Sequence, residues 1–152
     1  MTNAKPYLQS INFKRELVPS FEEYPFNIPA ISTLLSMDFH PDVTFIVGEN
    51  GAGKSTLVEG IALSLGFGIE GGTKNVNFQT HDNASPLSKY LATVRSFKKP
   101  NDSYFLRAES FYNVATYMDE VDYTKGYGVR SLHECSHGES FMATLTNKLS
   151  GG

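Results

Sequence analysis

Polar and apolar side chains alternate along residues 7–13 (YLQSINF), and this period of two predicts a β-strand near the N-terminus. Residues 14–24 are charged and contain a proline, which favours a loop. Short apolar groups at residues 26–28 and 37–39 predict two short strands, each followed closely by a proline. Residues 44–47 (TFIV) are β-branched or aromatic, so they predict a short buried strand.

The apolar spacing becomes helical in residues 55–65 (STLVEGIALSL), which therefore predict a helix. Its apolar face contains Leu57, Ile61 and Leu65. Gly66 and Gly68 follow directly and are suitable residues to end the helix.

A second helix is predicted to begin at Ser85-Pro86, because serine is a good N-cap and proline suits the first helical position. Its apolar face would contain Leu87, Leu91 and Val94. Residues 104–107 predict a strand, and residues 111–123 and 139–149 predict further helices. The intervening stretches, residues 69–84 and 125–131, contain glycine and predict loops.

Composition and charge narrow the class of protein. The 152 residues suit one domain, so we expect a single domain over residues 1–152. The net charge of −3 gives no general attraction to nucleic acid or to an anionic membrane. The one cysteine, Cys135, cannot form an internal disulfide and suits a reducing compartment. There is no signal-peptide pattern and no apolar run of transmembrane length, so the sequence predicts a cytoplasmic protein.

The candidate chemistry lies between the predicted strand 44–47 and the predicted helix 55–65. Gly48, Gly53, Lys54 and Ser55 match the pattern G-x-x-x-x-G-K-[ST]. Glycines let backbone N–H groups approach a phosphate closely, and the following helix directs its positive end at the anion. The lysine adds a charge on the β- and γ-phosphates, and the serine hydroxyl is a ligand for Mg²⁺. We therefore expect ATP and Mg²⁺ as cofactors.

The predicted nucleotide-binding residues are those of the segment GENGAGKST that line the phosphates. They are Gly48, Asn50, Gly51, Ala52, Gly53, Lys54, Ser55 and Thr56. Ser55 is also the first predicted metal ligand.

This segment, with Asn50 and the Gly51-Ala52-Gly53 spacing, resembles ABC-type ATPases, in particular the branch of chromosome-maintenance and recombination ATPases. Residues 136–140 (SHGES) resemble the signature loop of that family. Together with FEEYPFNIPAI, FLRAESFYN and SLHECSHGES, the pattern is similar to small predicted AAA/ABC-like ATPases of bacteria over nearly the whole chain. The resemblance implies an α/β P-loop NTPase fold of the ABC-ATPase type, with a mixed sheet and an antiparallel N-terminal part.

The resemblance also implies an ATP-dependent dimer, in which the signature loop of one copy contacts the γ-phosphate bound by the other. Ser136, Gly138 and Glu139 would be the signature residues. A capping box formed by Ser136 and Glu139 is the alternative, and it is compatible with the first reading. DNA and membrane partners are both left open by the sequence.

Two further roles follow from the resemblance. Tyr24 is the candidate for stacking on adenine, with Phe26 as its rival and an ordinary core or surface aromatic as the alternative. Glu109 is the candidate for the Q-loop position near Mg²⁺, with Gln79 as the alternative.

The catalytic residues stay unknown, because no apolar strand ending in Asp-Glu follows Ser140. Asp119-Glu120 precedes the signature-like loop, which is the wrong order for a Walker B strand. We therefore expect a fold that is incomplete at the C-terminus, with exposed apolar faces, marginal stability and a need for a partner or a complementary half-domain. A nucleotide-binding module without turnover is the alternative function, and a P-loop kinase is a third.

Overall fold

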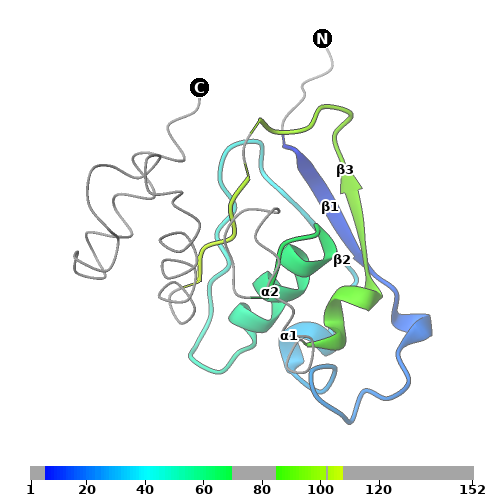
Figure 1. Ribbon diagram of the computed structural model, residues 1–152. Helices are drawn as coiled ribbons and strands as arrows, with labels where there is room; N and C mark the ends of the chain where they lie inside the picture. The colour runs from blue at the N-terminus through cyan, green and yellow to red at the C-terminus, as the bar shows by residue number, and fades with distance from the viewer. Residues whose placement is uncertain (1–5, 70–84, 102, 108–152) are drawn as a thin grey trace, which may run out of the picture. The chain divides into compact units, whose positions relative to one another are not determined.

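The computed structural model describes residues 6–69, 85–101 and 103–107. Contacts divide the chain into two compact units, Met1–Ile69 with Gln79–Pro100, and Glu70–Phe78 with Asn101–Gly152. The strands and helices named below all belong to the first unit (Figure 1). A single domain over residues 1–152 stays a prediction.

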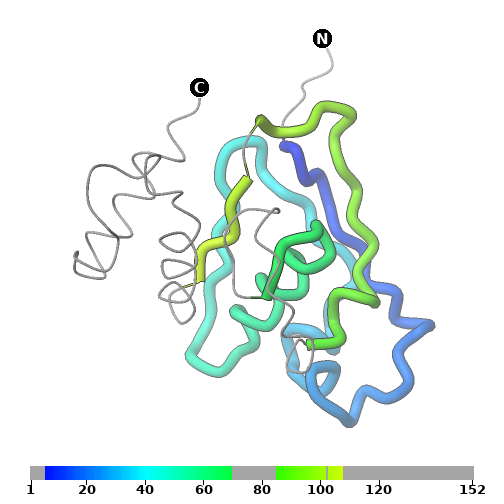
Figure 2. The backbone as a smooth tube through the Cα atoms, viewed as in Figure 1, coloured from blue at the N-terminus to red at the C-terminus, as the bar shows by residue number. Residues whose placement is uncertain are grey.

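A three-stranded antiparallel sheet with the order β2-β1-β3 forms one part of this unit. The strands are β1 (Leu8–Phe13), β2 (Ser36–Asp38) and β3 (Leu91–Arg95), and the tube in Figure 2 follows β1 and β3 side by side. Ile11 in the central strand lies opposite Met37 on one side and Thr93 on the other. The predictions of strands at residues 7–13 and 37–39 are thereby confirmed, with β2 beginning one residue early.

The helix predicted at residues 55–65 is confirmed as α2 (Lys54–Ser64). Gly53 is its N-cap, and Gly66, with φ +91°, follows the C-cap residue Leu65. Among the described residues there are also three shorter helical turns: η1 (Arg15–Leu17), α1 (Pro29–Ser32) and η3 (Pro86–Tyr90). None of the described helices has both the length and the apolar character that crossing a membrane requires.

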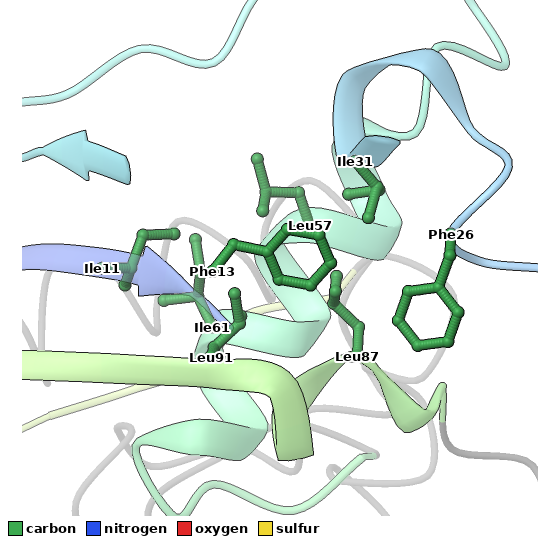
Figure 3. Packing of buried hydrophobic residues seen from close by; sticks show 8 residues of the cluster. All are labelled: Ile11, Phe13, Phe26, Ile31, Leu57, Ile61, Leu87 and Leu91. Carbon is green, nitrogen blue, oxygen red and sulfur yellow. The ribbon is translucent and has the colours of Figure 1, made fainter. Parts of the chain in front are cut away.

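The hydrophobic core lies between the sheet, α2 and the short helical turns (Figure 3). Alternate residues of β1 enter it, because successive side chains of a strand point to opposite faces. Phe26 stacks on Phe13, with 6.3 Å between ring centroids, and meets the Tyr90 ring edge-on at 4.9 Å. The buried residues of this core are Ile11, Phe13, Phe26, Ile31, Leu57, Ile61, Leu87 and Leu91.

A close approach of η3 to α2 depends on Gly60. A Cβ atom at this position would lie 2.9 Å from Leu87 Cδ2, which is closer than real side chains pack. The absence of a side chain at Gly60 therefore lets Leu87 be fully buried against α2.

Two predicted elements are wrong because backbone partners override local preference. Residues 26–28 form a turn, not a strand, because the N–H groups of Asn27 and Ile28 donate back to the carbonyls of Glu23 and Pro25. The predicted helix from Ser85 ends after the 3-10 turn η3, because the chain from Leu91 onward pairs with β1 as β3. The capping role of Ser85 is correct, since its hydroxyl accepts the N–H of Leu87.

The predicted buried strand at residues 44–47 is also wrong. These residues belong to no strand, and Phe45 and Val47 are 83% and 85% exposed. No strand within residues 6–69, 85–101 and 103–107 hydrogen-bonds to them, so their β preference has no partner to satisfy it. Of residues 104–107, only Phe105 makes a β-bridge.

The predicted helices at residues 111–123 and 139–149 lie outside the described residues. The expected antiparallel part of the sheet is present, and the parallel strands of a mixed sheet do not occur in the part of the chain that the structure describes.

Candidate functional site

The segment from Gly48 to Ser55, here called the phosphate loop, turns sharply after Val47 and ends in the first two residues of α2. The N–H of Ala52 donates to the carbonyl of Glu49 at 3.2 Å and closes the turn. Gly53 has φ +93°, a left-handed conformation that favours glycine over residues with a Cβ atom. This conformation lets the loop pass directly into the helix.

The N-terminus of α2 overlaps the phosphate loop, because Lys54 and Ser55 belong to both. The N–H of Leu57 donates to the carbonyl of Gly53 at 2.9 Å, which closes the first helical turn. The N–H groups of Lys54, Ser55 and Thr56 precede that bond and have no intrahelical acceptor. Together with the partial positive charge of the helix end, these donors make an environment that favours an anion.

The side chain of Lys54 folds back over the loop. Its ammonium group donates to the carbonyl oxygens of Gly48 at 2.8 Å and Glu49 at 2.7 Å. Lys54 is only half-buried, so the charge remains accessible from solvent. The positive charge therefore lies beside the same loop to which the helix end adds its N–H donors.

Ser55 is exposed on the first turn of α2, next to Lys54. Among the described residues, its hydroxyl has no hydrogen-bond partner. A free hydroxyl oxygen beside a phosphate site suits Mg²⁺, which binds one or two protein oxygens together with phosphate oxygens. The residues present therefore fit the ion.

Of the two aromatic candidates, Tyr24 is exposed beside this site and Phe26 is buried in the core. The Tyr24 side chain is 63% exposed, and its hydroxyl lies 3.4 Å from the Thr56 hydroxyl. Phe26 is only 4% exposed and belongs to the core, so its ring is not available to a ligand.

Comparison with known proteins gives one family. A family model described as an AAA domain matches residues 27–127, about two thirds of the chain, and the match contains the whole phosphate loop. The chain belongs to this AAA domain family. Searches of the curated proteins and of the solved structures gave no match.

Membership of the AAA domain family supports nucleotide binding and an ATPase-like domain. The finer resemblance to ABC-type ATPases is taken up below as a proposal.

Several predicted site residues of this AAA domain lie outside the described residues. They are the signature-like Ser136, Gly138 and Glu139, and the Q-loop candidates Glu109 and Gln79. Their roles stay predictions.

One residue beside the phosphate loop was missed by sequence reasoning. Ile28 lies against Gly53, so that a Cβ atom on Gly53 would be 2.5 Å from Ile28 Cγ2. The apolar pattern of residues 26–28 predicted a strand there and gave no signal of this contact. Only the folding of the turn brings Ile28 to the loop.

Proposed function

We propose that this AAA domain binds Mg-ATP through the phosphate loop and Thr56. The observation that carries the proposal is the position of Lys54. Its ammonium group lies 2.8 Å from the Gly48 carbonyl, beside the N-terminal end of α2 with its free N–H donors. A lysine charge, a tight loop and a helix N-terminus together favour a chain of phosphates over a neutral ligand.

The residues of the loop have separate roles in this proposal. Backbone N–H groups of the loop would bind phosphate oxygens, because its small residues leave the backbone accessible. The Ala52 N–H donates to the Glu49 carbonyl, so the donors would be those of Asn50, Gly51, Gly53, Lys54 and Ser55. Lys54 would bind the β- and γ-phosphates. Ser55 would hold Mg²⁺, which neutralises phosphate charge when bound.

Tyr24 would bind the base. Its ring is exposed while its hydroxyl lies near Thr56, one residue beyond Ser55, so the ring lies near the nucleotide side of the loop. Stacking on an aromatic ring does not need a hydrogen bond to the base and is therefore tolerant of base identity.

We further propose that the domain is of the ABC type and that ATP drives its dimerisation. The support is the resemblance of GENGAGKST and SHGES to that family. In this proposal Ser136, Gly138 and Glu139 of one copy complete the phosphate site of the other, and Glu109 contacts Mg²⁺. Hydrolysis would follow in the dimer or with a complementary half-domain.

The deciding experiment is a calorimetric titration of Mg-ATP into the purified chain. Lys54→Ala should lose affinity by about ten- to hundredfold, the scale of a charge-assisted hydrogen bond. Lys89→Ala is the matched control, since Lys89 is an exposed lysine in η3 and is not part of the loop. Equal affinity for the wild type and Lys54→Ala would refute binding at this loop.

Binding without turnover is the second candidate. In this candidate the chain is a regulatory module, and its ATP-driven dimerisation controls a partner. Phosphate release and ATP-dependent dimerisation separate the candidates. The ATPase is supported if ATP induces a dimer that Ser136→Arg abolishes, and if the chain releases phosphate faster than Lys54→Ala. A dimer that forms with ATP but releases no phosphate supports the module without turnover.

A further inference from the structure

The backbone of Ile28 is fixed on both sides, between the turn at Pro25 and the start of α1. Its N–H donates to the Pro25 carbonyl at 3.2 Å. Its carbonyl accepts the N–H groups of Ile31 at 2.9 Å and Ser32 at 2.8 Å. The half-buried side chain of Ile28 is also packed against the hydrophobic core. Ile28 is therefore a well-fixed support for whatever it contacts.

The contact that Ile28 makes is with Gly53, the N-cap of α2. A Cβ atom on Gly53 would lie 2.5 Å from Cγ2, 3.6 Å from Cδ1 and 3.7 Å from Cβ of Ile28. The Cγ2 methyl group thus occupies the space beside Gly53 and prevents the loop from moving toward α1. Gly53 is also the residue whose carbonyl closes the first turn of α2.

A second contact from the same segment reaches the other side of the site. The Tyr24 hydroxyl lies 3.4 Å from the Thr56 hydroxyl, while Ile28 lies against Gly53. Between these two contacts, Pro25 and Phe26 are buried in the core. Residues 24–28 therefore contact Gly53 and Thr56, which flank Lys54-Ser55 on either side, and connect them to the core.

We propose that Ile28 is a positioning residue for nucleotide binding, and that it acts through its Cγ2 methyl group on Gly53. The methyl group holds the last peptide of the phosphate loop where its N–H donors can meet a phosphate. Ile28 itself touches no phosphate. This inference depends on the proposed binding of Mg-ATP at the loop.

Two substitutions of Ile28 separate positioning from simple burial. Ile28→Val keeps Cγ2, and Ile28→Leu removes the branch at Cβ while keeping the size of the side chain. We expect Ile28→Val to keep the wild-type affinity for Mg-ATP and Ile28→Leu to lose about tenfold, comparable with the loss when residues that orient metal ligands are replaced. Simple burial would favour leucine over valine.

The experiment is a calorimetric titration of Mg-ATP and of Mg-tripolyphosphate into each variant. The temperature is kept below the melting temperature of each variant, which circular dichroism measures. Leu34→Ala is the matched control, because Leu34 is also a partly buried apolar residue packed on the same core, while the three atoms nearest to a Cβ position on Gly53 all belong to Ile28. The loss in Ile28→Leu should be equal for both ligands, since Ile28 acts on the phosphate loop and not on the base.

Each other outcome overturns the inference. Equal affinities of Ile28→Val and Ile28→Leu remove the role of Cγ2. An equal loss in Leu34→Ala shows general destabilisation, and a loss for ATP without a loss for tripolyphosphate places the effect at the base. A wild-type chain that is folded but binds neither ligand refutes the proposed function itself, and this inference with it.

Discussion

The ammonium group of Lys54 and the carbonyl oxygen of Gly48 are joined by a hydrogen bond of 2.8 Å. This bond folds the side chain of Lys54 across the phosphate loop, from the first residue of α2 to the first residue of the loop. A bound phosphate would therefore find the charge already beside the loop, without a large movement of the chain.

The first prediction concerns the geometry of the charged group at position 54. Lys54→Arg keeps the charge but replaces a compact ammonium group by a planar, longer guanidinium, which two converging carbonyls do not suit. We expect a loss of Mg-ATP affinity of at least about tenfold, or about 1.4 kcal/mol, with little change in melting temperature. Calorimetry and circular dichroism measure the two quantities. Wild-type affinity in Lys54→Arg would show that only net charge matters.

The second prediction compares two glycines of the loop. Gly51 and Gly53 both have positive φ, +80° and +93°, but a Cβ atom on Gly51 would meet nothing within 4 Å, whereas on Gly53 it would collide with Ile28. Gly51→Ala should cost about 1–2 kcal/mol from backbone conformation alone. Gly53→Ala should cost more in both stability and Mg-ATP affinity. Chemical denaturation measures the free energy of unfolding, and calorimetry measures the affinity for Mg-ATP. Equal losses in Gly51→Ala and Gly53→Ala would contradict the prediction.

The third prediction tests the aromatic ring of Tyr24. Tyr24→Phe keeps the ring and loses the contact with the Thr56 hydroxyl, so it should bind Mg-ATP about as well as the wild type. Tyr24→Ala should lose about 1–3 kcal/mol of binding free energy, the scale of base stacking on an aromatic side chain. Mg-tripolyphosphate, which has no base, is the control ligand. A loss for tripolyphosphate as large as that for ATP would count against stacking.

The fourth prediction concerns the contact between α2 and η3. In an open helix Gly60→Ala would stabilise by about 1 kcal/mol. Here the new methyl group would lie 2.9 Å from Leu87 Cδ2 in a filled core, and such overpacking costs about 1–3 kcal/mol. We expect Gly60→Ala to lower the free energy of unfolding in the wild type and to raise it in a Leu87→Ala background. Urea denaturation of the wild type, Gly60→Ala, Leu87→Ala and the double variant measures the free energies of unfolding and hence the coupling between the two positions.

The fifth prediction concerns the exposed apolar segment at residues 43–47. Phe45 and Val47 are among its most exposed side chains, and the segment pairs with no strand in the described part of the chain. An exposed segment rich in β-branched residues is a template for association with other chains. Phe45→Ser combined with Val47→Thr should reduce self-association, followed by light scattering over a range of concentrations, without lowering the melting temperature.

Phe97→Ser is the matched control for the fifth prediction, because Phe97 is 73% exposed but lies in a bend after β3. This control should change self-association little. A wild-type chain that stays a monodisperse monomer at every concentration, with a sharp two-state melt, would contradict the prediction.

The sequence by itself determined the elements whose causes are local. The phosphate loop needs glycines, a lysine and a helix start within a few consecutive residues, and all of these are visible in GENGAGKST. The same holds for α2, where the spacing of Leu57 and Ile61 gives one apolar face, and for β1, where alternation places Ile11 and Phe13 in the core. Local spacing and local backbone preference are enough to fix such elements.

Only the tertiary structure decided the elements that depend on a distant partner. Leu91 could continue a helix by its spacing, but pairing with Phe13 makes it the start of β3. Residues 44–47 have the composition of a buried strand, yet no neighbouring strand among the described residues pairs with them. The contact of Ile28 with Gly53 joins residues 25 positions apart and leaves no trace in the pattern. The physical reason is that backbone hydrogen bonds and close packing depend on which chain segments meet in space, and composition alone does not specify that meeting.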